Sequence, residues 1–248
     1  MNQSFFIGAV GAHQQLKRLT VHSNNIANVN TYGFKAEKGR FTALMYDNIR
    51  AADNETLPSG VGSALWSTST DFSCGPVLTT ERDQDYMIMG DGFFAVVDLE
   101  NNEVSLTRNG AFSISELQRP SAEVDEEGVP IMETVYYLSD NLGRFVLSQN
   151  GGMIEVEDRT AEQPVGVFDY INYNGMEHID GTRFTAVDKN GGIQLSQSKA
   201  VRGLLEQSNS DLAEELSKVI ETQRAYGMAL KMVLTSDEIE TTINGLSS

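Results

Sequence analysis

The sequence predicts an α+β protein, with long N- and C-terminal helices that pair as a coiled-coil-like end domain and a mainly antiparallel β middle domain. Two patterns support this prediction. Apolar residues recur with a heptad period near both ends of the chain, which is typical of helices that pack along a seam. Between them, Asn-Gly and Gly-Gly turn signals separate short β-type runs.

The first heptad pattern lies at the N-terminus, where the spacing between its members alternates between four and three residues. Its members are Phe5, Ala9, Ala12, Leu16, Leu19, Ser23 and Ile26. We expect a helix from about residue 4 to about residue 29. The helix should end there because Asn28, Asn30 and Gly33 tolerate turns and left-handed backbone.

The second heptad pattern lies at the C-terminus and predicts a longer helix, from about residue 211 to residue 243. One row of this pattern consists of Leu205, Leu212, Val219, Tyr226 and Val233, and a second row, four residues later, includes Leu216, Gln223 and Leu230. Polar seam residues such as Gln223 fix the register or the number of partners. Asp211 and Glu214 resemble a capping box, and Asn244-Gly245 resembles a helix stop.

The middle of the chain is predicted to be β. Residues 86–89 and 93–97 have the composition of strands around a turn at residues 90–92, and further turn signals at intervals of ~10–20 residues predict a meandering antiparallel sheet. The predicted domains are 1–35 (N-terminal helix), 36–80 (a connector or extended arm rich in Ser, Thr and Gly), 81–198 (β domain) and 199–248 (C-terminal helix).

The distribution of charge is more informative than the net charge of −17. Residues 81–190 hold 22 acidic and 7 basic side chains, which disfavours nucleic acid and anionic membranes as partners. An alternative interpretation of this region is a solvated surface that aids solubility. Residues 1–50 are net basic and residues 199–248 net acidic, which favours pairing of the ends. With no run of eighteen apolar residues we expect no membrane insertion, and residues 1–10 lack the basic segment of a secretory signal.

We expect no catalytic, cofactor-binding or metal site. His13 and His22, nine residues apart, fall on opposite faces of a helix and cannot share a metal ion. Cys74, the single cysteine, has no nearby histidine to activate its thiol. Residues 90–92 lack the spacing of a phosphate-binding loop, and residues 188–192 lack the spaced ligands of a calcium loop.

Four blocks of sequence occur in a recognisable order along the chain. The first is SNNIANVNTYGFK at residues 23–35, which includes Asn24, Asn25, Ala27, Asn28, Thr31, Gly33 and Phe34. The others are TLPSGVG at 56–62, GDGFFAV at 90–96 followed by LTRNGAF at 106–112, and LEQSN at 205–209 continuing to QRAY at 223–226. Together these blocks resemble the rod and hook family of the bacterial flagellar basal body, and within it the distal-rod members.

The resemblance implies a non-catalytic structural subunit of the flagellar basal-body rod, which polymerises helically to form the shaft between motor and hook. The implied partners are further copies of this chain, other rod and hook proteins, and the flagellar type III export apparatus. The seam residues are then the candidate subunit contacts, namely Phe5, Ala9, Ala12, Leu16, Leu19, Ile26, Leu212, Leu216, Val219, Gln223, Tyr226, Leu230 and Val233. The motif at residues 24–35 would mark a hinge between the helical end and the rest of the chain.

One segment departs from the family pattern. Residues 118–133 are acidic and contain proline, where the family continues into a glycine-rich strand repeat. A hook or proximal-rod subunit therefore remains an alternative. A secreted cell-wall glycan hydrolase, which would use acidic residues of the middle domain as acid and base, is an alternative of another class. A soluble binding module is a third.

Overall fold

The computed structural model describes residues 3–43, 46–50, 56–60, 63–124 and 130–246 of the chain. These residues form two compact units. The helical unit comprises Met1–Val29, Ala36–Phe72 and Ser210–Ser248, and the β unit comprises Asn30–Lys35 and Ser73–Asn209. The expectation of two terminal helices and a mainly antiparallel β middle is confirmed.

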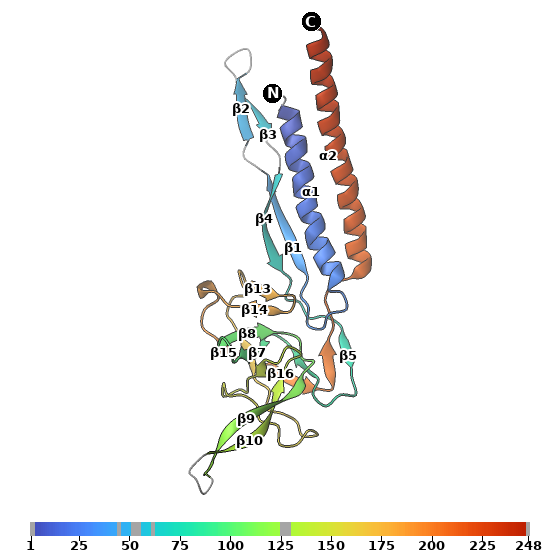
Figure 1. The fold of residues 1–248 in the computed structure, drawn as a ribbon. Helices are drawn as coiled ribbons and strands as arrows, with labels where there is room; N and C mark the ends of the chain where they lie inside the picture. The colour runs from blue at the N-terminus through green and yellow to red at the C-terminus, as the bar shows by residue number, and fades with distance from the viewer. Residues whose placement is uncertain (1–2, 44–45, 51–55, 61–62, 125–129, 247–248) are drawn as a thin grey trace. The chain divides into compact units, whose positions relative to one another are not determined.

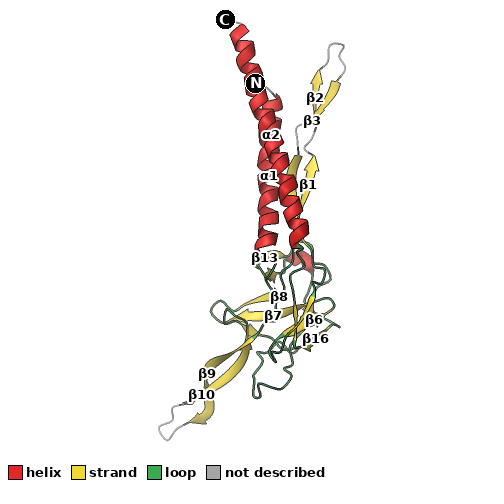
Figure 2. Cartoon of the chain, turned by 90° about the vertical axis from the view of Figure 1, so that its right-hand side faces the viewer, coloured by secondary structure: helices red, strands yellow, loops and turns green. Residues whose placement is uncertain are grey.

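The helical unit is built on α1 (Gln3–Ala27) and α2 (Leu212–Leu246), which lie side by side in opposite directions (Figures 1 and 2). Asp211 caps α2, because its carboxylate accepts hydrogen bonds from the backbone N–H groups of Ala213 at 2.8 Å and Glu214 at 3.3 Å. The predicted stop at Asn244-Gly245 was wrong, since α2 continues through both residues. A glycine inside a helix costs only about 1 kcal/mol and does not by itself end it.

Two pairs of strands complete the helical unit. β1 (Glu37–Ala43) pairs antiparallel with β4 (Ser63–Thr70), and both pack against α1 (Figure 1). The side-chain oxygen of Gln14 on α1 accepts a hydrogen bond from the backbone N–H of Leu65 at 2.9 Å. β2 (Tyr46–Arg50) pairs with β3 (Thr56–Gly60). α1 therefore has α2 on one side and the β1–β4 ribbon on another.

The described part of the β unit contains a nine-stranded sheet. Seven strands follow the order β13-β14-β8-β7-β11-β10-β9, β12 pairs with β7, and β15 pairs with β12. β6 pairs with β16 and β5 pairs with β17 in separate two-stranded sheets. The elements are β5 (Val77–Thr79), β6 (Tyr86–Met89), β7 (Phe93–Asp98), β8 (Glu103–Thr107), β9 (Ser113–Val124), β10 (Pro130–Ser139), β11 (Phe145–Val146), β12 (Val167–Asp169), β13 (Glu177–Asp180), β14 (Arg183–Thr185), the short helix η1 (Asp188–Asn190), β15 (Gln194–Leu195), β16 (Lys199–Arg202) and β17 (Leu204–Glu206).

The predicted meander is only partly correct. β7–β8 and β9–β10 are local hairpins, but β6 does not pair with β7 across residues 90–92. Its partner β16 lies more than a hundred residues later in the sequence, and local turn signals carry no information about such a pairing. The strands enclose one core that includes Tyr86, Phe94, Val96 and Leu138, all almost fully buried. Among the described residues, no helix is long and apolar enough to span a membrane.

Candidate assembly site

The face of α2 that meets α1 combines buried polar side chains with the partly buried Val219, Tyr226 and Val233. Its fully buried residues are Glu215, Thr222 and Ser236, which recur at multiples of seven positions. The hydroxyl oxygens of Ser4 and Ser236 lie 2.9 Å apart. A Cβ atom on Gly8 would lie only 3.0 Å from a methyl group of Val233, so the small residue at this position lets the two helices approach closely.

A buried polar contact joins the other end of the two helices. His22 Nδ1 lies 2.6 Å from the Glu215 carboxylate, which also accepts a hydrogen bond from the Lys218 ammonium at 3.1 Å. Burial alone would raise the pKa of the Glu215 carboxyl, but the hydrogen bonds from His22 and Lys218 outweigh it and lower the pKa. The ionised carboxylate therefore stabilises the contact between α1 and α2.

The predicted seam residues divide into two groups. Val219, Tyr226 and Val233 on α2, and Ala12, Leu19 and Ile26 on α1, are buried or partly buried. In contrast, Phe5, Ala9, Leu16, Leu212, Leu216, Gln223 and Leu230 are exposed. The second contact row of α2 lies three residues after the first, at Glu215 and Thr222, rather than four residues after it. Apolar spacing could not identify this row because its members are polar. The role of the predicted residues in subunit contacts stays a prediction.

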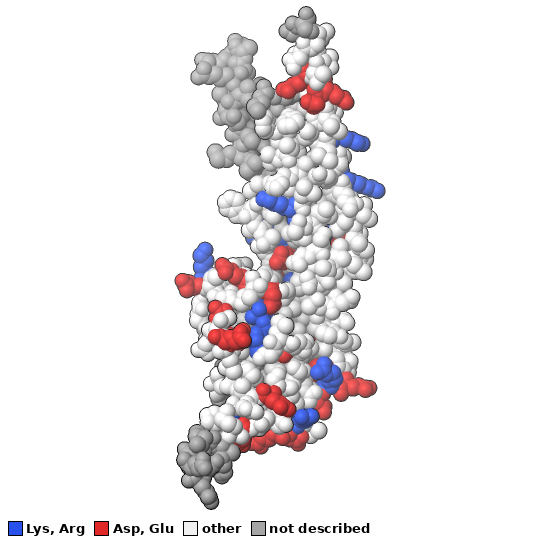
Figure 3. All heavy atoms as spheres, viewed as in Figure 1, with Lys and Arg blue, Asp and Glu red and all other residues white. Residues whose placement is uncertain are grey.

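The exposed apolar surface of α2 extends beyond the predicted residues. The additional side chains are Ile220, Met228, Met232, Leu234, Ile239 and Ile243. Residues 225–236 contain a single charged residue, Lys231. Figure 3 shows few charged side chains over the middle of this helix on the visible face. Exposed apolar side chains gathered along one helix are of the kind that marks interaction sites.

The first half of the motif, in the helical unit, anchors the end of α1. The Asn25 side-chain amide donates to the carbonyl of Glu37 at 2.9 Å and accepts from the N–H of Glu37 at 2.9 Å, as a neighbouring strand would. The Asn28 amide donates to the carbonyl of Asn24 at 3.0 Å and so extends the last turn. Asn25 is 1% exposed. These asparagines bond to backbone groups, and the hinge role of the motif stays a prediction.

The second half of the motif, in the β unit, contributes to a buried charge cluster. Gly33 has φ of 69°, and a Cβ atom there would lie 2.3 Å from the backbone nitrogen of Asn109, so only glycine fits. Phe34 is 1% exposed, Lys35 is fully buried, and the Lys35 ammonium pairs with the Glu206 carboxylate. Ala27 is exposed, and the carbonyl of Thr31 accepts a hydrogen bond from the N–H of Phe34 at 3.3 Å.

Glu206 is the centre of this cluster. Besides Lys35, its carboxylate accepts hydrogen bonds from Arg108 at 3.3 Å and from the backbone N–H of Gly75 at 2.9 Å. The Lys35 ammonium also donates to the carbonyl of Ser73 at 2.7 Å. Burial lowers the pKa of Lys35, and Glu206 opposes that shift. The cluster joins segments from both ends of the β unit, and sequence patterns missed it because isolated Lys, Arg and Glu residues carry no periodic signal.

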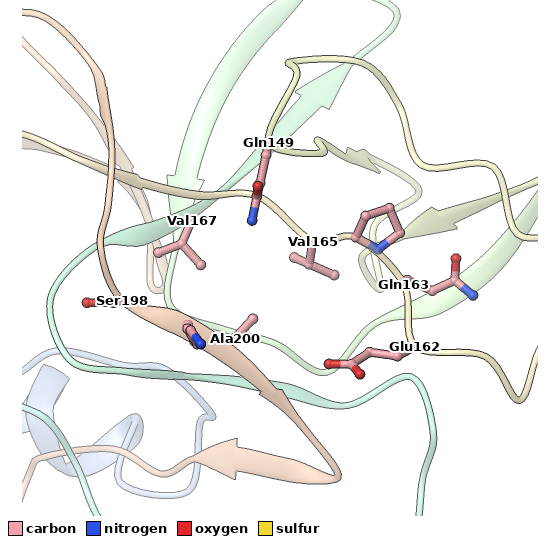
Figure 4. A pocket seen from close by; sticks show the side chains of 9 residues that line it. Gln149, Glu162, Gln163, Val165, Val167, Ser198 and Ala200 are labelled. Carbon is pink, nitrogen blue, oxygen red and sulfur yellow. The ribbon is translucent and has the colours of Figure 1, made fainter.

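The β unit also contains a hollow of about 380 Å³ beside β16 (Figure 4). It is lined by Gln149, Glu162, Gln163, Pro164, Val165, Val167, Ser198, Lys199 and Ala200. A glycoside hydrolase needs two carboxylates across its substrate, whereas this described lining contains one, Glu162. The part of the chain that the structure describes has no group of three or more His, Cys, Asp or Glu side chains placed to hold a metal ion.

Comparison with known proteins identifies the family. Residues 7–35 match the family described as flagella basal body rod protein, and residues 201–246 match the C-terminal family of the flagellar basal body rod FlgEFG proteins. These two regions contain most of α1 with its motif and all of α2. The contacts between α1 and α2, and those of the motif, therefore lie largely in the two regions that match the family.

Full-length relatives extend the similarity to the β unit. The chain is 31% identical over 263 aligned residues to the flagellar basal-body rod protein FlgG of Buchnera aphidicola subsp. Schizaphis graminum, covering 96% of this chain and 97% of the relative. It is 27% identical to FlgG of Borreliella burgdorferi, covering 99% of each chain. It is 28% identical to the rod protein FlgF of Caulobacter vibrioides, covering 96% and 95%. The chain therefore belongs to the flagellar basal-body rod protein family and resembles its FlgG members in particular.

Proposed function

We propose that the chain is a structural subunit of the flagellar basal-body rod and that it polymerises helically through its terminal helices. Membership of the rod family supports the structural role. One observation carries the mode of assembly: an apolar row of α2 beside the face that contacts α1 is exposed in the single chain. Leu212, Leu216 and Leu230 are 45%, 46% and 39% exposed.

Burial of these side chains supplies a driving force for assembly. Moving a Leu side chain from water into a packed interface contributes roughly 1.5–3 kcal/mol. α1 and the β1–β4 ribbon leave the outward row of α2 uncovered, so neighbouring copies that pack on it recover this free energy. Phe5 and Leu16 offer further exposed apolar surface on α1. Contacts between different faces of two copies generate a helical polymer when the rotation from copy to copy does not close into a ring.

We infer that α1 and α2 pair in a coiled-coil-like manner within each subunit, because the buried residues of α2 recur at heptad positions. Other rod and hook proteins would continue the shaft above and below this subunit. Export would proceed through the flagellar type III apparatus, and the assembled protein would lie in the basal body. Torque transmission requires many lateral contacts, which a long helix with an exposed apolar side provides.

The proposal is tested with full-length protein carrying Leu216→Ser and Leu230→Ser together. Loss of two interface leucines should raise the concentration needed for assembly by roughly tenfold or more, measured by sedimentation velocity and negative-stain electron microscopy. The matched control is Leu142→Ser, a substitution of the same chemistry at a side chain in the β unit that is 71% exposed. We expect the control to assemble like the parent chain.

Two outcomes would count against the proposal in different ways. A double variant that assembles at the parent concentration would exclude the outward row of α2 as the interface. A parent chain that stays monomeric at every concentration would contradict the rod function. In the source bacterium, deletion of residues 1–30 should give basal bodies without a complete rod, and normal rods that contain the truncated subunit would overturn the role of α1.

A further inference from the structure

The only tryptophan of the chain, Trp66, lies exposed on β4 of the helical unit. Its side chain is 78% exposed, more than any other exposed aromatic side chain among the described residues. The pairing of β1 with β4 is irregular at this point, because Arg40 pairs with Ser67 while Phe41 pairs with Leu65. Trp66 is thus the extra residue of a β-bulge, a feature that redirects a side chain.

The bulge directs Trp66 away from α1. The Phe41 ring lies 5.3 Å beneath the guanidinium carbon of Arg18 on α1, so Phe41 faces the helix. Leu65 is opposite Phe41 in the ladder and therefore faces the same side. Trp66 is the unpaired residue of the bulge, where regular alternation is broken, and its high exposure shows that its ring is not packed against α1. A large amphipathic ring held outward on a paired strand has little conformational entropy to lose on binding, which is why Trp dominates interface energetics.

We propose that Trp66 anchors a contact with a second copy of this chain, by packing on the charge-poor outward surface of α2 at residues 225–236 of that copy. This inference rests on the proposed helical polymer and adds to it a contact outside the two helices. The occupant is a second copy because the helical unit itself carries the complementary surface. Met228 and Leu234 are 65% and 62% exposed.

The chemistry of the two surfaces matches. Methionine thioethers make favourable contacts with aromatic rings and adapt to their shape. Lys231, the single charged residue of this stretch, can place its ammonium group over an indole face. Neither surface presents a carboxylate that would have to be desolvated, since residues 225–236 and residues 64–70 contain no acidic residue.

The positions of the two surfaces favour a head-to-tail contact. α1 lies between the β1–β4 ribbon and α2 (Figures 1 and 2), so Trp66 and the outward side of α2 belong to different faces of the helical unit. The two surfaces also lie at similar heights, because Leu65 bonds Gln14 on α1 and Gly11, one turn away, approaches Ala229 on α2. A contact between unlike faces is heterologous, and with a small displacement along the axis from copy to copy it winds into an open helix instead of a ring.

Tryptophan fluorescence tests the proposal directly, because Trp66 is the only source of tryptophan emission. Emission and acrylamide quenching of the full-length chain would be measured below and above its assembly concentration, with assembly followed by sedimentation. We expect solvent-like emission and strong quenching in the monomer. On assembly, emission should move to shorter wavelength and the quenching constant should fall several-fold. Assembly with unchanged emission and quenching would overturn the Trp66 contact but leave the rod function intact.

Substitutions test the energetic role of the ring. Trp66→Ser should raise the assembly concentration by roughly tenfold or more, as expected for an interface anchor, whereas Trp66→Phe should stay within a few-fold of the parent. Because Trp66 is exposed, both variants should keep the monomer's thermal unfolding temperature. Equal assembly of the Ser variant would contradict the proposal. Failure of every chain, the parent included, to assemble would instead refute the proposed function on which it rests.

Cross-linking tests the partner surface. In chains carrying Cys74→Ser, a copy with Trp66→Cys mixed with a copy with Met228→Cys should form a disulfide between copies on mild oxidation during assembly. The matched control replaces Met228→Cys with Leu216→Cys, another exposed position on α2 outside residues 225–236. Preferential cross-linking at residue 228 supports the proposed surface. Equal or greater cross-linking at residue 216 would show that Trp66 packs elsewhere.

Discussion

The two units of the chain bury their apolar residues to very different degrees. In the β unit, Phe94, Val96 and Leu138 are fully buried inside one enclosed core. In the helical unit, α2 buries polar residues such as Glu215 and Thr222 against α1 and leaves leucines and methionines in water. The β unit therefore has a complete core within one chain, whereas the helical unit leaves apolar surface that neighbouring copies would cover in the proposed polymer.

The largest expected effect comes from substituting comparable apolar residues in the two units. Phe94→Ala should lower the free energy of unfolding by about 3–5 kcal/mol, because it opens a cavity in the core of the β unit. Leu216→Ala should change the stability of the monomer by no more than about 0.5 kcal/mol, since the side chain is already exposed. Urea denaturation of both full-length variants measures the difference. Similar losses at both positions would show that the helical unit has a closed core of its own.

The next effect tests what holds the two ends of the β unit together. Glu206→Gln keeps the size of the side chain but leaves Lys35 and Arg108 buried without their counter-charge. We expect the free energy of unfolding to fall by about 3 kcal/mol. Glu157→Gln, at an exposed position in the same unit, is the matched control and should be neutral. If both variants unfold at the same urea concentration, the cluster does not contribute to closing the unit.

A smaller effect should appear at the contact between the helices. The folded-state pKa of Glu215 is lowered, so its contribution to stability is present above the unfolded-state value and is lost as pH falls through the folded value. Glu215→Gln should therefore cost about 1–2 kcal/mol at neutral pH and remove part of the acid sensitivity of α1 and α2. Hydrogen exchange of α1 and α2, compared between neutral and acidic pH, measures this loss of stability and of acid sensitivity. An unchanged pH profile in the variant would exclude Glu215 as the source.

Local periodicity predicted the elements of the fold better than their partners. The heptad spacing of Leu212, Val219 and Tyr226 predicted a long helix, and α2 is one. The same spacing could not show which row faces α1. The contact uses Glu215 and Thr222, and a search for apolar periodicity does not include polar residues. In the β unit, turn signals located β6 and β7, but the pairing of β6 with β16 depends on tertiary structure that local sequence does not encode.

The motif at residues 24–35 shows the same division. Its asparagines and Gly33 predicted a change in chain direction, which is what Asn25 and Gly33 provide. Its last residue, Lys35, has a role that depends on Glu206, which is far away in the sequence. Buried ion pairs of this kind are set by three-dimensional proximity alone, so a single sequence gives no signal for them. Polar contacts were therefore the part of the site that only the structure revealed.

Hydrogen exchange, compared between the monomer and the assembled form of the full-length chain, tests the central claim most directly. We predict that amides of α2 exchange much faster than those of β7 in the monomer, and that assembly slows exchange along α2 while leaving β7 unchanged. Exchange in α2 that is already as slow as in β7 in the monomer, with no change on assembly, would contradict the claim that neighbouring copies complete the helical unit.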